Sequence, residues 1–151
     1  MNKVEFYYVT LIDAAREKVW EALTNGEFTK QYWHMTEVQS DWAVGDTVVF
    51  MVGDEVGCEG EVLVADAPRS LSYTWHFPGN PACAAEAPSR VLFSLEEIEG
   101  ITKLTVRHDK FSSESSPTYQ MVSPGWPFVL AGLKTLCETG KTVDFSALKI
   151  T

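Results

Sequence analysis

The feature that most constrains the fold is a long stretch of alternating apolar and polar residues, followed by a single long helical pattern. From Thr36 to Phe111 most segments have a period of two, which is typical of half-buried β-strands. Ser123–Gly140, SPGWPFVLAGLKTLCETG, instead has its large apolar residues three and four positions apart. A sheet of this size must bury one face, and only this helix is long enough to cover it. The chain is therefore predicted to be α+β, with one curved antiparallel sheet around a C-terminal helix.

This terminal helix contains residues that usually disrupt helices, namely Pro124, Pro127 and Gly132. Ser123 can cap a helix, and a proline in the first turn loses little hydrogen bonding, so we expect the helix to begin at Ser123. Gly132 is expected to lie off the buried face, where it relieves contact with a neighbouring segment or subunit. Phe128 is expected to contact the polar connector before the helix, SSESSP at residues 112–117, or alternatively to mark a self-association patch; we favour the connector.

The residues before the sheet indicate one strand and two short helices. Residues 3–12, KVEFYYVTLI, are rich in β-branched and aromatic residues, as strands are. Helical spacing follows in AAREKVWEALT and in EFTKQYW, on either side of Asn25-Gly26. About six antiparallel strands then form a meander. Within it, Pro78–Pro88 has three prolines and no periodicity, so we expect a loop that borders a site.

Length and charge exclude several classes of protein. The chain has 151 residues, of which 45% are hydrophobic, and is expected to form one domain over residues 1–151. No run approaches the roughly 20 apolar residues of a membrane span, and the start does not resemble a secretory signal, so we expect a cytoplasmic protein. The net charge of −9, without a Lys/Arg cluster, argues against nucleic-acid partners.

Motifs for metal binding and catalysis are not found in the sequence. The cysteines are odd in number, form no C-x-x-C pair and are interpreted as small hydrophobic residues: Cys58, Cys83 and Cys137. The histidines are far apart in sequence: His34, His76 and His108. No nucleophile elbow, phosphate loop or dinucleotide fingerprint is present. We therefore assign no metal, cofactor or catalytic residue, and favour a binding protein over an enzyme.

Strand alternation and helix periodicity predict which residues face a cavity between the sheet and the last helix. The expected ligand-binding residues are Trp33, Trp42, Phe50, Tyr73, Trp75, Phe93, Val106, His108, Trp126, Val129, Leu130 and Leu133. Any single one of the strand residues is more often an ordinary core residue than a ligand contact. The tryptophans could form the rim or lid of the cavity. Alternatively, they could fill the ends of the sheet as structural residues.

Two polar residues have both a functional and a structural interpretation. His108 lies two positions after Val106 in the predicted strand, so both side chains should face the cavity. There His108 could bond a ligand oxygen or act as a base. Alternatively, it could be a histidine near a strand end whose hydrogen bonds are all made within the protein. Arg90 begins a strand after the Pro78–Pro88 loop. It could anchor a carboxylate, or be a solvated charge at a strand edge.

Four segments in the same order resemble one known family. They are AAREKVWEALTNGEFTKQYW, GEVLVADAPRSLSYTWHF, PSRVLFSLEEIEGITKLTVRHDKF and GWPFVLAGLKTLCETG. Together they are similar to the activator of heat-shock protein 90 ATPase homologue family, within the START-like (SRPBCC, Bet v-like) superfamily. The resemblance runs from about Val4 to Gly140. It implies a helix-grip fold, in which a curved antiparallel sheet of about six to seven strands wraps around the C-terminal helix and encloses a deep cavity.

The resemblance also implies what the protein does. Similar proteins bind hydrophobic or amphipathic molecules, such as lipids or polyketides, in that cavity, and we expect the same here. A minority are cyclases or aromatases, so an enzyme using Tyr73, His108 or Arg90 is one alternative. A stress-response module that contacts a chaperone is another. A homodimer is also left open.

Overall fold

The computed structural model describes residues 4–145 of the chain. The element order is β1 (Phe6–Ile12), α1 (Arg16–Thr24), α2 (Gly26–Tyr32), β2 (Thr36–Gln39), β3 (Thr47–Val52), β4 (Glu55–Asp66), β5 (Ser70–Trp75), α3 (Pro81–Ala84), β6 (Ser89–Ile98), β7 (Ile101–Asp109) and α4 (Pro117–Thr139). Residue 3 of the expected first strand and residues 146–151 of the expected domain lie outside the described part. The loop expected over Pro78–Pro88 contains the short helix α3.

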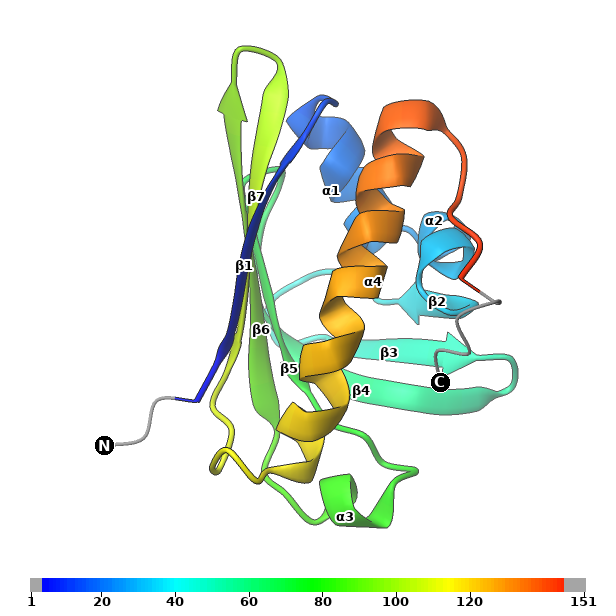
Figure 1. Ribbon diagram of the computed structural model, residues 1–151. Coiled ribbons are helices and arrows are strands. Elements are labelled where there is room, and N and C mark those ends of the chain that lie inside the picture. Colours follow the sequence, from blue (N-terminus) through cyan, green and yellow to red (C-terminus); the bar gives the residue numbers. More distant parts are fainter. Residues whose placement is uncertain (1–3, 146–151) are drawn as a thin grey trace.

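One antiparallel sheet of seven strands, in the order β1-β7-β6-β5-β4-β3-β2, curves around α4 (Figure 1). This confirms the predicted α+β helix-grip fold. The ladder is irregular between Phe50 and Met51 and between Val62 and Val64, and such bulges bend strands. Gly60 lies near the second irregularity, where a Cβ atom would overlap the backbone of Thr74. Glycine therefore permits the close approach of β4 and β5 at the bend.

Helix α4 begins earlier than the sequence suggested. Ser116 is the N-cap, and its Oγ accepts a hydrogen bond from the Tyr119 amide at 3.1 Å. The expected start at Ser123 was wrong, because Pro124 and Pro127 lie inside the helix. Each proline removes one backbone hydrogen bond. Both are exposed, on a side of the helix where water can bond the freed carbonyl groups.

The expectations for Gly132 and Phe128 need correction. Gly132 is buried, and a Cβ atom there would lie 3.0 Å from the Tyr32 Cβ and 3.1 Å from the Tyr32 carbonyl oxygen. It therefore lies on a packed face, contrary to expectation, but it does relieve contact with a neighbouring segment, α2, as expected. Phe128 is half-buried and packs edge-on against Phe145, with ring centroids 5.4 Å apart. Its ring partner therefore lies in the segment after α4, where the sequence suggested the connector or a self-association patch.

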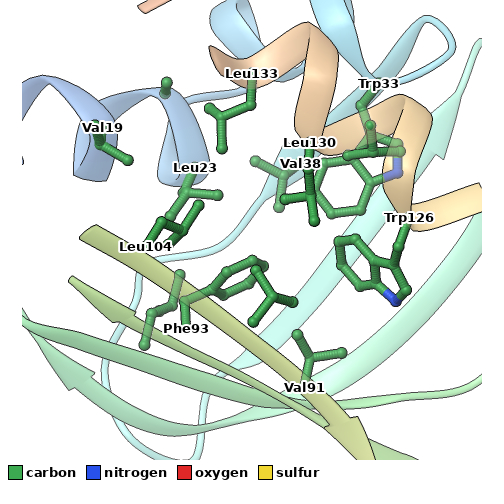
Figure 2. Packing of buried hydrophobic residues seen from close by; sticks show 14 of the residues in the cluster. Val19, Leu23, Trp33, Val38, Val91, Phe93, Leu104, Trp126, Leu130 and Leu133 are labelled. Atoms are coloured by element: carbon green, nitrogen blue, oxygen red, sulfur yellow. The ribbon is translucent and has the colours of Figure 1, made fainter. Parts of the chain in front are cut away.

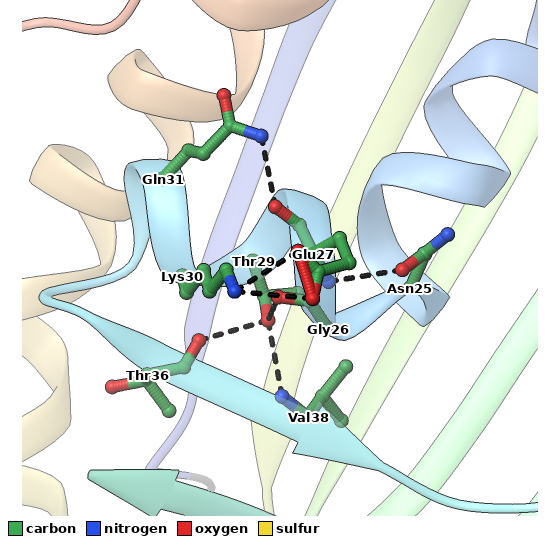
Figure 3. Close-up of polar contacts among 8 residues, drawn as sticks. All are labelled: Asn25, Gly26, Glu27, Thr29, Lys30, Gln31, Thr36 and Val38. Carbon is green, nitrogen blue, oxygen red and sulfur yellow. Dashed lines mark hydrogen bonds and ion pairs between the residues drawn. The ribbon is translucent and has the colours of Figure 1, made fainter. Parts of the chain in front are cut away.

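A buried threonine joins α2 to β2 (Figure 3). The Thr29 hydroxyl donates to the Thr36 carbonyl oxygen at 2.8 Å and accepts from the Val38 amide at 3.0 Å. Asn25 caps the start of α2 by accepting from the Glu27 amide. These bonds hold α2 against β2. They thereby fix the position of Trp33, which directly follows α2 in the chain.

The middle of α4 packs directly on the sheet and on α1. Leu130, Leu133, Phe93 and Leu104 are each at most 2% exposed and belong to one continuous core with Val19 (Figure 2). Cys58, Cys83 and Cys137 are buried and free, as small hydrophobic residues would be. Among residues 4–145, no helix combines the length and apolar character that crossing a membrane requires.

Candidate functional site

An apolar pocket of about 200 Å³ lies between the first half of α4, the end of β5 and the segment after α2. Its lining residues are Trp33, His34, Thr36, Trp75, Phe77, Met121, Val122, Gly125, Trp126 and Val129. The volume is below the roughly 300–1,000 Å³ typical of drug-sized sites. The pocket therefore suits a small molecule, or one end of a longer one.

Three tryptophans form the inner wall of this pocket. Trp33 and Trp75 are stacked, with ring centroids 6.1 Å apart and planes 14° from parallel. Trp126 is tilted against both, at 5.4 Å from Trp33 and 6.0 Å from Trp75. Phe77 meets Trp75 edge-on at 5.6 Å. Aromatic rings at these distances form a rigid apolar surface with few freely rotating groups.

The indole nitrogen of Trp75 is the unsatisfied polar atom in this wall. Trp75 is 5% exposed, and its Nε1 atom is buried with no hydrogen-bond partner among residues 4–145. A buried N–H group without an acceptor costs about 1–3 kcal/mol. A ligand oxygen that accepts from this nitrogen would recover that free energy, once the side chains that bury the nitrogen move aside.

The Trp126 indole, by contrast, is held by His108 on β7. Trp126 Nε1 donates to His108 Nδ1 at 3.1 Å, and His108 Nε2 lies 2.7 Å from the Ser89 hydroxyl oxygen. Because an indole nitrogen can only donate, His108 Nδ1 carries the lone pair and Nε2 carries the proton. Ser89 then accepts from His108 and donates to the Trp75 carbonyl oxygen at 3.4 Å. Both ring nitrogens of His108 are therefore engaged within the protein.

Burial determines the charge states of the two buried polar rings near this wall. Burial lowers the pKa of His108 from 6.5 to about 3, although the neighbouring Asp109 acts in the opposite direction. Burial likewise raises the pKa of Tyr73 well above its ordinary value. Both side chains are neutral near pH 7, in agreement with the hydrogen bonds that His108 makes.

The structure distributes the predicted site residues over three places. Four line the pocket: Trp33, Trp75, Trp126 and Val129. Seven are buried in the core beneath or beside it: Phe50, Tyr73, Phe93, Val106, His108, Leu130 and Leu133. Trp42 lines a separate open groove, and its Nε1 atom donates to the Thr24 carbonyl oxygen at 3.0 Å. The pocket thus occupies one end of the space where the resemblance implied a deep cavity.

Arg90 does not face the pocket. Its guanidinium group binds both carboxylate oxygens of Asp109, at 2.9 and 2.6 Å. Arg90 on β6 and Asp109 on β7 lie opposite each other in the sheet, so this ion pair joins the two strands. Within residues 4–145, no three His, Cys, Asp or Glu side chains are grouped so that they could hold a metal ion.

Six lining residues are absent from the predicted ligand-binding set, although alternation places Phe77 on the same face as Trp75: His34, Thr36, Phe77, Met121, Val122 and Gly125. Three of them, Met121, Val122 and Gly125, lie on the first turns of α4, just before or just after the expected helix start at Ser123. Ser116 followed by Pro117 is also an N-cap followed by a proline at the first helical position. Had that earlier start been chosen, Val122 and Trp126 would have been placed one turn apart on the same face.

Three solved structures illustrate the similarity of the fold. Protein MLL2253 from Mesorhizobium loti is 26% identical, with a TM-score of 0.74, over 88% of this chain and 96% of that one. An HSP90 activator from Plasmodium falciparum is 17% identical, with a TM-score of 0.71, over 87% and 94%. DynU16, a putative protein in the dynemicin biosynthetic locus, is 21% identical, with a TM-score of 0.73, over 91% and 48%.

The sequence itself matches one family model over most of its length. No curated protein matches it. The matching model is that of the Activator of Hsp90 ATPase homolog 1-like protein, and the match covers residues 13–138, from the turn after β1 to the last turn of α4. The chain therefore belongs to the Activator of Hsp90 ATPase homolog 1-like protein family.

Proposed function

We propose that the protein binds an apolar or amphipathic small molecule, lipid-like or polyketide-like, in the pocket formed by Trp33, Trp75 and Trp126. The ligand carries an oxygen or another acceptor that bonds the Trp75 Nε1 atom. The observation that carries this proposal is that Trp75 lines an apolar pocket while its buried nitrogen has no hydrogen-bond partner in the described part of the chain. Apolar walls supply affinity and one placed donor supplies orientation, as in most small-molecule sites.

The similarity to a protein encoded in a biosynthetic locus for a natural product supports the polyketide-like class, at the level of fold. The geometry gives less support to catalysis by His108 or Arg90. The lone pair of His108 accepts from Trp126, and Arg90 is paired with Asp109. The protonated Tyr73 hydroxyl lies in the core. We therefore favour binding over a cyclase or aromatase.

Gly125 offers a direct test, because it lines the pocket and a Cβ atom there would have no neighbour within 4 Å. Gly125→Leu should place a side chain in the pocket without disturbing the fold. Medium-chain fatty acids and aromatic ketones are suitable probes for a thermal-shift series. A true ligand at 100 times its Kd should stabilise the wild type by about 2.7 kcal/mol. The proposal fails if no probe raises the melting temperature, or if Gly125→Leu keeps the full shift.

Contact with a chaperone ATPase is a second candidate, supported by the family to which the chain belongs. It requires no small molecule and is tested separately. Addition of the protein to an Hsp90-type ATPase should raise the rate of ATP hydrolysis, and the two should co-purify. An unchanged rate together with no co-purification would rule this candidate out.

A further inference from the structure

The apolar pocket contains no fixed charge. Among residues 4–145, no aspartate, glutamate, lysine or arginine lines it. The titratable residue in the lining, His34, is exposed at the mouth, as is Met121, which is 47% exposed. His108, behind the aromatic wall, is uncharged near pH 7 because burial lowers its pKa to about 3. A charged ligand group inside the pocket therefore meets no counter-ion.

This lining disfavours anions such as fatty-acid carboxylates. A carboxylate that leaves water without a counter-ion loses its hydration and gains no ion pair in return. The net charge of −9 adds a long-range repulsion of anions. A fatty acid is therefore expected to keep its carboxylate outside the mouth, where that group cannot accept from the Trp75 nitrogen.

Organic cations are disfavoured for a different reason. Tryptophan faces bind a cation well when several of them surround it. The ring centroids of Trp33, Trp75 and Trp126 lie only 5.4–6.1 Å from one another, so the rings pack together and do not enclose a cation. The Trp75 N–H group has no hydrogen-bond partner in the described part of the chain and requires an acceptor, which a quaternary ammonium ion lacks.

The wall instead suits a flat aromatic ring. Aromatic pairs prefer centroid distances of about 4.5–7 Å. The Trp33–Trp75 and Trp75–Phe77 pairs, at 6.1 and 5.6 Å, already have this geometry. A ligand ring against the wall adds pairs of the same kind, and the Met121 thioether packs favourably against ring edges. A rigid ring also loses fewer rotatable bonds on binding than an alkyl chain does.

We propose that the pocket selects neutral aromatic carbonyl compounds, such as aryl ketones and quinones, over fatty acids and organic cations. This selectivity rests on the proposed function, whose ligand class it narrows. The ligand ring lies against the tryptophans, and its carbonyl oxygen accepts from Trp75 Nε1. Both groups share a volume of about 200 Å³, so the carbonyl group is attached directly to the ring.

Four probes of similar shape test this selectivity by NMR titration slightly above pH 7, where benzoate is ionised. They are acetophenone, cyclohexyl methyl ketone, benzoate and phenyltrimethylammonium. The two ketones share the carbonyl group and differ in aromaticity. Acetophenone should bind the wild type about twofold to tenfold more tightly than the saturated ketone, because only its ring forms aromatic pairs. It should bind at least about tenfold more tightly than either ion.

A charge added at the mouth should change the selectivity. Met121→Lys places an ammonium group beside the pocket and should raise the affinity for benzoate relative to acetophenone by at least about fivefold. Val44→Lys is the matched control, because Val44 is a 70% exposed apolar residue outside the pocket lining and the net charge changes equally. Its ratio of affinities should equal that of the wild type.

The outcomes separate this proposal from the proposed function. If neither these probes nor fatty acids bind the wild type, the proposed function fails and this selectivity fails with it. If a fatty acid, the saturated ketone or either ion binds as tightly as acetophenone, the selectivity is overturned while ligand binding stands. An unchanged benzoate ratio in Met121→Lys would also overturn it, because the lack of a counter-ion would then not exclude anions.

Discussion

Trp126 on α4 donates its indole N–H to His108 on β7 at 3.1 Å, and both residues are buried. This bond joins the helix to the sheet at the base of the pocket and fixes the orientation of one tryptophan in its wall. It also sets the histidine tautomer, so that the proton lies on the side of Ser89. The three side chains form one fully bonded chain next to the ring of Trp75, whose nitrogen has no hydrogen-bond partner among residues 4–145.

The buried neutral His108 should make stability depend on pH. Its pKa is lowered from 6.5 to about 3 by burial, so below pH 6.5 the unfolded state binds a proton that the folded state does not. Stability should therefore fall as the pH decreases from 6.5 towards 3, by about 1.4 kcal/mol per pH unit from this group. Urea unfolding between pH 4 and 7 measures this change in the free energy of unfolding.

His108→Gln is the control for this effect, since an amide can accept and donate but does not titrate. Acidic side chains contribute to both proteins, so the difference between the two slopes isolates the histidine. An equal pH dependence in the wild type and the variant would show that His108 is protonated as readily in the folded protein as in the unfolded chain.

Ser89→Ala should remove the acceptor for the His108 Nε2 proton. A buried N–H without a partner costs about 1–3 kcal/mol, so the free energy of unfolding should decrease by that amount. Ser94→Ala on the same strand is the matched control, because Ser94 is exposed. Its unfolding free energy should change by less than about 0.5 kcal/mol. Equal effects would mean that the Ser89 bond contributes nothing.

Replacing either of two glycines in α4 with alanine should change the stability of the protein, in opposite directions at the two positions. Alanine is favoured over glycine inside a helix by about 1 kcal/mol. Gly125→Ala should gain stability, because its Cβ atom meets open space. Gly132→Ala should lose stability, because its Cβ atom would lie 3.0 Å from Tyr32 and α2 would have to move. Thermal unfolding of both variants decides this, and stabilisation by Gly132→Ala would contradict the packing described.

Thr29→Val should weaken the attachment of α2 to β2. Valine has nearly the same shape but cannot bond the Thr36 carbonyl oxygen or the Val38 amide. The loss should be about 1–3 kcal/mol in the free energy of unfolding. Hydrogen exchange should show faster local opening at the Val38 amide. An unchanged exchange rate there would mean that the hydroxyl is dispensable.

The fold could be predicted well from the sequence, because strand alternation and helical periodicity are local signals that the tertiary structure reinforces. The seven-stranded sheet, the two short helices and the covering helix were all expected. The start of α4 was misplaced because Ser116-Pro117 and Ser123-Pro124 both fit a helix start. At the observed start Glu86 accepts from the Thr118 amide, a contact across 32 residues that no local pattern in the sequence reveals.

The pocket could be predicted only in part, because periodicity identifies a buried face but not where that face is filled. Leu130 shares the predicted face of α4 with Trp126, yet it lies in the continuous core with Phe93 of β6 and does not line the pocket. Gly125 opens space by lacking a side chain, and no pattern of apolar residues signals that. The role of the predicted residues in ligand binding stays a prediction until a ligand is tested.

The central claim is that the Trp75 nitrogen bonds a ligand acceptor, and a pair of nearly isosteric probes tests it most directly. Acetophenone carries a carbonyl oxygen and cumene does not. Their dissociation constants should be measured by calorimetry or NMR titration for the wild type, for Trp75→Phe and for Trp42→Phe, whose indole nitrogen is already bonded to Thr24.

The account predicts that Trp75→Phe lowers the affinity for acetophenone relative to cumene by about fivefold, which corresponds to roughly 1 kcal/mol for one hydrogen bond. Trp42→Phe should leave that ratio unchanged. The same ratio of affinities in the wild type and in Trp75→Phe would contradict the account.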